Sequence, residues 1–63
     1  MARYRCYFIG SHGQLVGAEN VDGANDEEAI AIARRLFAQK AYASGFELRQ
    51  GQRRIATQEV RVS

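Results

Sequence analysis

The first residues of the chain alternate between apolar and polar side chains. Over residues 3–9 the apolar side chains on one side are Tyr4, Cys6 and Phe8. A period of two is typical of a β-strand with one buried face. Two glycines interrupt the pattern within residues 10–13, and a second extended run follows over residues 14–21. The pattern predicts a β-hairpin.

The loop chemistry gives this hairpin a register. A three-residue loop over residues 11–13, with its glycine in the left-handed conformation, would place Phe8 opposite Val16 and Cys6 opposite Ala18. Both strands would then send apolar groups to one face. The second run does not alternate cleanly, which a β-bulge would explain.

The longest periodic segment is residues 25–42, and it predicts a helix. Asn25 is a typical N-cap, and Glu28 stands where a capping-box carboxylate reaches back to the N–H of Asn25. The acids of the first turn and the bases toward the end both complement the helix dipole. The apolar residues that share one face are Ala29, Ile30, Ala33, Leu36, Phe37 and Ala41. We expect Phe37 to anchor this face to a sheet.

A second hairpin follows a glycine terminator at position 45. A two-residue turn with Gly51 first, of type II′, opposes Leu48 to Ile55. A turn with Gly51 second would instead oppose Leu48 to Arg53. We prefer the first register because it places apolar side chains opposite each other.

The order strand, strand, helix, strand, strand defines the fold class. The chain contains no proline, and no linker or repeat divides residues 1–63. We therefore predict a single α+β domain with two layers, in which a four-stranded antiparallel sheet made of two hairpins carries one helix on one face. Residues 59–63 either extend the last strand or fray.

Several segments of the chain resemble a group of small proteins. They are YRCYFIG, GQL, AENV, NDEEAIAIAR and FELRQGQRRIA. Three motifs carry the resemblance: a Tyr-Arg-x-Tyr-Phe opening, an acidic helix start that leads into Glu-Ala-Ile, and a Glu-Leu-x-x-Gly-x-Arg ending. In this chain they fall on Tyr4, Arg5, Tyr7 and Phe8, on Asp26, Glu28, Ala29 and Ile30, and on Glu47, Leu48, Gly51 and Arg53. The group comprises proteins of unknown function that are abundant in rhizobia and other alphaproteobacteria. Many of them carry tryptophan where this chain has Arg49. The resemblance implies this fold and a bacterial cytosolic setting, and it brings no activity with it.

Composition narrows the classes of function. A single cysteine excludes an internal disulfide. One cysteine and one histidine are too few ligands for a usual structural zinc site. No apolar run approaches the roughly 20 residues that span a bilayer, and we expect a cytoplasmic protein with no membrane partner. Sixty-three residues are near the lower limit for a self-sufficient core, so self-association is the expected source of further burial.

Charge is unevenly distributed along the chain. Through Ala33 there are two bases and five acids, whereas from Arg34 onward there are seven bases and two acids, for a net charge of +2. This asymmetry would suit a complementary self-contact or a basic surface for a polyanion. Solvated charges that complement the helix dipole explain it equally well.

No residue pattern indicates catalysis. His12 lies in a turn without a nucleophile and an orienting acid around it, and Cys6 lies on the apolar face, where a thiol is inert. The consecutive acids 26–28 diverge by about 100° per residue and cannot converge on one ion. The glycines form no phosphate-binding motif. We therefore expect no enzyme activity, no metal and no cofactor.

The predicted function is a non-catalytic protein–protein interaction or regulatory module that forms a homodimer. Ile9 and Leu15 on the outer sheet face, and Ile32 on the helix flank, would be apolar surface left open in a monomer. The alternative is nucleic-acid binding through basic residues and one tyrosine on the outer face. Arginines on an exposed sheet face also simply keep it soluble. The candidate surface is Arg3, Arg5, Tyr7, Ile9, Leu15, Ile32, Arg49 and Arg54.

Overall fold

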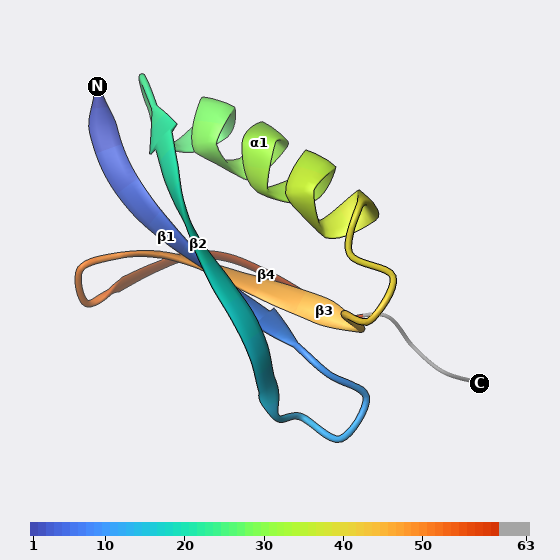
Figure 1. Cartoon of the computed structure of the whole chain (residues 1–63). Helices are drawn as coiled ribbons and strands as arrows, with labels where there is room; N and C mark the ends of the chain where they lie inside the picture. The colour runs from blue at the N-terminus through green and yellow to red at the C-terminus, as the bar shows by residue number, and fades with distance from the viewer. Residues whose placement is uncertain (60–63) are drawn as a thin grey trace.

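One helix lies across one face of a four-stranded antiparallel sheet, as Figure 1 shows. The structure is a computed structural model, and it describes residues 1–59. The elements are β1 (Ala2–Ile9), β2 (Leu15–Gly23), α1 (Asp26–Ala38), β3 (Gly45–Gln50) and β4 (Arg53–Glu59). The predicted α+β class and the ββαββ order are confirmed. No helix in this part of the chain is long and apolar enough to cross a membrane.

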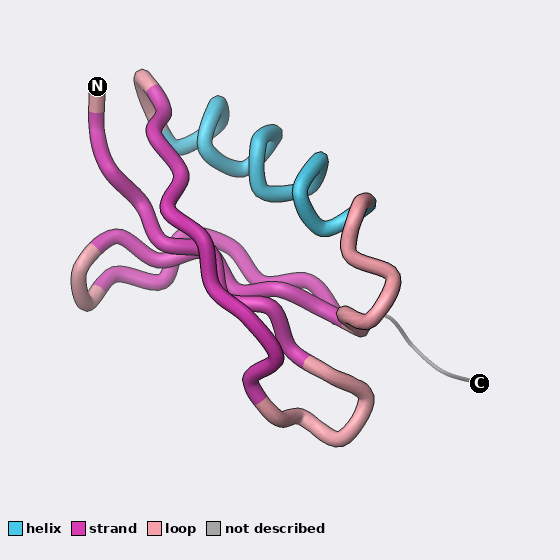
Figure 2. The backbone as a smooth tube through the Cα atoms, viewed as in Figure 1, coloured by secondary structure: helices cyan, strands magenta, loops and turns pink. Residues whose placement is uncertain are grey.

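The strand order is β2-β1-β3-β4, so the two hairpins meet where β1 pairs with β3. The central strands β1 and β3 supply most of the buried side chains, while β2 and β4 form the edges. Figure 2 shows the strong twist of the sheet and the loops that close the hairpins at its two ends. The predicted continuation of β4 beyond Glu59 lies outside the described residues.

The first hairpin has the predicted loop but a different register. The Gly10 N–H donates to the Gln14 carbonyl oxygen at 2.7 Å, and Gly13 has a φ of +79°. Val16 is an extra residue without a partner on β1, because Ile9 pairs with Leu15 and Phe8 with Gly17. The expected pairs Phe8–Val16 and Cys6–Ala18 are therefore wrong by one residue, and the bulge is the reason.

The second hairpin also has the predicted turn and a register that a bulge shifts by one residue. Gly51 has a φ of +60°, and Gln50 pairs with Arg53 across the turn, as the preferred register requires. The bulge follows at Ile55, so Leu48 lies opposite Ala56 instead. The turn is predicted correctly, and the pairing beyond the bulge is again shifted by one residue.

The helix begins as expected, with one change in its cap. The Asn25 side-chain oxygen accepts from the Glu28 N–H at 2.9 Å. The Glu28 carboxylate accepts from the Ala24 N–H at 2.8 Å, one residue before the N–H that a capping box uses. Both contacts satisfy backbone donors that the first helical turn leaves free.

The helix ends about four residues earlier than the sequence predicts. The N–H groups of Gln39 and Lys40 donate to the carbonyl oxygens of Leu36 and Phe37, three residues back, at 3.1 and 3.0 Å. Such contacts tighten the last turn and close the helix. Ala41 is exposed and outside the helix, so its expected place in the buried stripe is wrong.

The core lies between the inner sheet face and α1. Its buried residues are Tyr4, Cys6, Phe8, Val21, Ala29, Ala33, Phe46 and Leu48. Phe37 is half-buried against this core, with its ring centroid 5.4 Å from that of Phe46. Ile32 also packs against the core, so the expectation that it forms open surface on the helix flank is wrong. Beside the small Ala33, its larger side chain reaches the rim of the core.

Contacts fasten both ends of α1 to the sheet. The Tyr4 hydroxyl donates to Asp26 at 2.7 Å, and Arg53 reaches the same carboxylate at 3.1 Å. At the far end Lys40 forms an ion pair with Glu19 of β2, and its ammonium group lies 5.5 Å from the centroid of the Phe8 ring.

Gly23 allows the close approach of β2 to the helix. A Cβ on Gly23 would lie 3.0 Å from the backbone nitrogen of Ala29 and 3.2 Å from its Cα. Because backbone atoms cannot yield like a flexible side chain, we expect Gly23→Ala to lower the free energy of unfolding by about 1–2 kcal/mol, measured by urea denaturation. Gly17→Ala is the matched control, since its nearest neighbours would be at 3.7 Å. Equal losses in the two variants would contradict this explanation.

Candidate functional site

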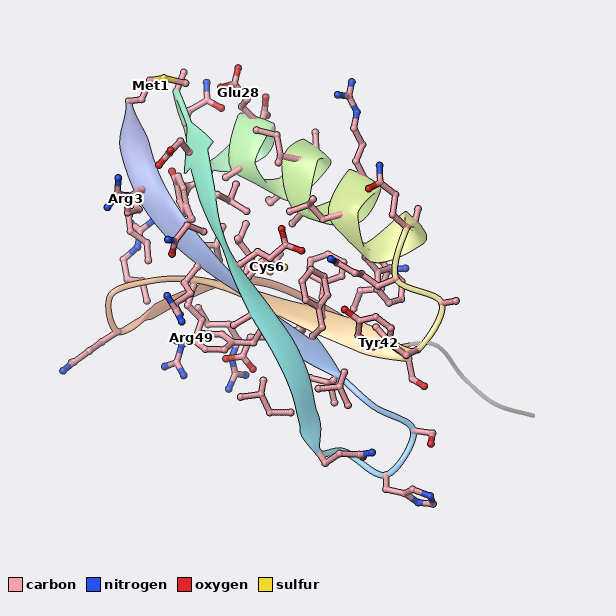
Figure 3. The ribbon with its side chains drawn as sticks, in the orientation of Figure 1. Met1, Arg3, Cys6, Glu28, Tyr42 and Arg49 are labelled. Atoms are coloured by element: carbon pink, nitrogen blue, oxygen red, sulfur yellow. The ribbon has the colours of Figure 1, made fainter. Side chains whose placement is uncertain are left out.

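The outer face of the sheet is the face opposite α1, and no element formed by residues 1–59 covers it. In Figure 3 Arg3 and Arg49 lie on this side, whereas Cys6 lies between the sheet and α1. Residues that pair across neighbouring strands share a face. The strand register therefore arranges the outer face into rows that run across the sheet.

One of these rows contains three arginines. Arg5 of β1 pairs with Arg49 of β3, and Arg49 pairs with Arg54 of β4. We call Arg5, Arg49 and Arg54 the arginine row. Asn20 continues the row on β2, where it accepts a hydrogen bond from the Arg5 guanidinium at 3.1 Å. The Arg5 guanidinium also lies 5.8 Å from the centroid of the Tyr7 ring.

The carboxylate of Glu47 partly neutralises the arginine row. Glu47 is in the next row of β3, and its carboxylate oxygens lie 3.4 Å from Arg49 and 3.9 Å from Arg54. Its side chain is only 20% exposed, so the carboxylate is held close to the sheet. Two of the three guanidinium groups of the row thus lie within 4 Å of this carboxylate, whereas Arg5 contacts Asn20 instead. Like charges directly opposite each other in a sheet are destabilising.

Next to the arginine row the outer face becomes apolar. Tyr7, Ile9 and Leu15 lie together around an open hollow of about 250 Å³ that Glu47 and Arg49 also line. We call Tyr7, Ile9 and Leu15 the apolar corner. Leu15 is 61% exposed, although it is a large aliphatic side chain on an edge strand. The corner and the row are neighbours on one continuous surface.

The structure brings together seven of the eight predicted surface residues. Arg3, Arg5, Tyr7, Ile9, Leu15, Arg49 and Arg54 are all on the outer face. Ile32 belongs to the helix on the other side and does not join them. Arg3 is engaged with Asp22 of β2 at 3.4 Å.

Sequence reasoning missed Glu47 as a member of this surface. The residue is two positions before Arg49 on the same strand, and period-two alternation would have placed both side chains on one face. The arginine row could not be predicted in this way, because it forms only where β1 pairs with β3 and these strands are far apart in the sequence.

The side chains considered as possible catalytic groups or metal ligands do not belong to this surface. His12 is exposed in the β1–β2 loop, where its backbone N–H donates to the Gln14 side chain at 2.9 Å. Cys6 is fully buried, and desolvation raises the pKa of its thiol to about 11. Among residues 1–59, no group of three or more His, Cys, Asp or Glu side chains could hold a metal ion.

Comparison with known proteins adds no assignment to this surface. The chain matches no protein-family model, no curated protein and no solved structure. The resemblance to small alphaproteobacterial proteins therefore stays a prediction, and the outer face of the sheet is the basis for a functional proposal.

Proposed function

We propose that this protein is a non-catalytic interaction module of the cytoplasm that forms a homodimer through the outer face of its sheet. The observation that carries the proposal is the apolar corner. Leu15, Ile9 and Tyr7 lie side by side on a sheet face that no other element of the described chain covers. A grouped apolar surface of this kind is typical of a contact site, whereas scattered exposed side chains are not.

The small core supports the same proposal. Of the eight buried apolar residues in the part of the chain that the structure describes, two are alanines and one is cysteine, so much of the core contributes little apolar area. A domain of this length buries a smaller fraction of its surface than a larger one does. In a twofold-symmetric dimer each contact residue is used twice, which makes even a small patch effective.

The dimer can be tested by light scattering at micromolar concentrations. We expect the wild type to have twice the chain mass of 7.0 kDa. Leu15→Lys should shift the mass to that of one chain, because it places a charge in the apolar corner at a position that costs the monomer little. Ala31→Lys adds the same charge on the exposed side of α1 and should leave the dimer intact.

Two results would contradict the proposal. The first is a wild type with the mass of one chain at every concentration tested. The second is a dimer that survives Leu15→Lys but not Ala31→Lys, since that result would place the interface on the helix. Far-ultraviolet circular dichroism of each variant shows that the fold is retained.

A further inference from the structure

The arginine row is costly for the sheet that contains it. Two successive cross-strand pairs, Arg5 with Arg49 and Arg49 with Arg54, place like charges directly opposite each other. Charged side chains that keep a sheet face soluble or protect its edges need not lie directly opposite each other. Within residues 1–59 the Nε atom of Arg49 is buried and has no hydrogen-bond partner. The row therefore has a surplus of positive charge on a sheet face that no element within residues 1–59 covers.

The shape of the row indicates an extended anion. Neighbouring strands are about 4.8 Å apart, so three strands hold the arginine side chains over a span of about 10 Å. One isolated phosphate group is too small to contact the whole row. Arginine forks bind phosphate oxygens in pairs, and a ligand with repeated phosphates would match successive guanidinium groups.

Tyr7 gives the site a second kind of contact. It is half-buried on the outer face, two positions after Arg5 on β1, and the Arg5 guanidinium lies 5.8 Å from its ring centroid. If Arg5 bound a phosphate instead, this face of the Tyr7 ring would be free to stack on a base. Aromatic side chains on an open sheet stack the unpaired bases of single strands, which a duplex does not offer.

We propose that the arginine row, together with Tyr7, binds the phosphate backbone and one unpaired base of a single-stranded nucleic acid. This inference goes beyond the proposed dimer, because the arginine row lies beside the apolar corner. Tyr7 belongs to the corner and to this site, so a second copy of the chain and a nucleic acid would compete for it. Glu47 acts as an internal counterion that holds Arg49 and Arg54 and competes with the phosphates for them. The net charge of +2 adds little long-range attraction, so binding is expected at low ionic strength and should fall steeply with added salt.

Fluorescence anisotropy with a labelled oligothymidylate of about 15 nucleotides tests the site. We expect the wild type to bind with a log–log salt slope of about −0.7 for each phosphate contacted. Arg49→Gln should weaken binding and reduce this slope by about 0.7. Arg34→Gln is the matched control, because it removes the same charge from the exposed side of α1 and should change neither quantity.

Two further variants separate the roles of charge and stacking. Tyr7→Leu should weaken binding about 5- to 100-fold without changing the salt slope, because it removes stacking alone. Glu47→Gln should tighten binding, since it removes the competing carboxylate. If Glu47 only held the arginine side chains in place, Glu47→Gln would weaken binding instead.

Competition with other anions identifies the class of ligand that the site binds. Inorganic phosphate and pyrophosphate should displace the oligonucleotide only weakly, and a duplex of the same length should bind less tightly than the single strand. The proposal is overturned by any of three results: no binding by the wild type at low ionic strength, equal effects of Arg49→Gln and Arg34→Gln, or displacement by polyglutamate as efficient as by unlabelled oligothymidylate. Light scattering on the same samples reports the dimer separately, so either proposal can fail alone.

Discussion

Phe46→Ala is expected to lower the free energy of unfolding by about 3–5 kcal/mol. Phe46 is 1% exposed on the central strand β3, and its ring packs against Phe37 of the helix. A domain of this length has a total stability of roughly 3–9 kcal/mol at typical values per residue. The expected loss is therefore a large part of the total stability, which urea denaturation at 25 °C followed by circular dichroism would measure.

Phe37→Ala is the informative comparison for this prediction. Its ring takes part in the same aromatic contact, but the residue is only half-buried, so the cavity left by truncation would be open to solvent. We expect a clearly smaller loss than for Phe46→Ala. A larger loss for Phe37→Ala would show that the helix anchors the core and that the sheet side of the contact matters less.

The elements of the fold could be predicted because each has a local signal. Alternation over residues 3–9, the cap at Asn25 and the glycines at positions 13 and 51 determine where the strands, the helix and the turns begin. These signals act over a few residues, and the structure confirms the elements that they predict. The turns also determine the first pairs of each hairpin.

The irregular alternation of residues 14–21 indicates a bulge in β2, which the structure confirms. The positions of the two bulges could not be predicted from the turns, and they decide which side chains are buried. Without the extra residue at Val16, Val21 would point to the outer face beside Arg3. With it, Val21 pairs with Tyr4 and enters the core, and the inner face receives Gly23 where α1 approaches. The burial of Val21 and the close approach of the helix thus favour a register that turn geometry alone does not select.

The sequence pattern overestimates the length of the helix for a similar reason. The N–H of Ser44 donates to the Ile9 carbonyl oxygen at 2.7 Å, which fixes where the chain must rejoin the sheet. Residues 39–44 span the distance from α1 to that point, so they are not available for another helical turn. Helical periodicity carries no information about this tertiary requirement.

The outer face could be predicted in outline but not in detail. Alternation on β1 correctly places Arg3, Arg5 and Tyr7 on the side away from the helix. The alignment of Arg5 with Arg49 depends on how the two hairpins meet, and no local pattern encodes that register. The candidate residues were therefore found individually, and only the structure shows that three of them form a row.

Raising the pH from 9 to 11 is expected to destabilise the protein by about 2 kcal/mol through Cys6 alone. The thiol is fully buried, and desolvation, with a smaller contribution from the Glu19 carboxylate, raises its pKa from an ordinary value of 9.0 to about 11. Below pH 9 the thiol is protonated in both folded and unfolded chains, so its contribution does not change. Between pH 9 and 11 the unfolded chain loses the proton while the folded chain retains it, and stability falls by at most about 1.4 kcal/mol per pH unit.

Two other groups titrate in the same direction, and the experiment must separate them. The hydrogen bond to Asp26 raises the pKa of Tyr4, and the hydrogen bond to Glu19 raises the pKa of Lys40, so both also favour the folded state until the pH passes their raised pKa values. Urea denaturation of wild type and Cys6→Ala at several pH values from 8 to 11 isolates the thiol. The cavity left by Cys6→Ala lowers stability equally at every pH, so the difference in slope above pH 9 belongs to Cys6. Parallel curves for the two proteins would show that the thiol is not protonated preferentially in the folded state.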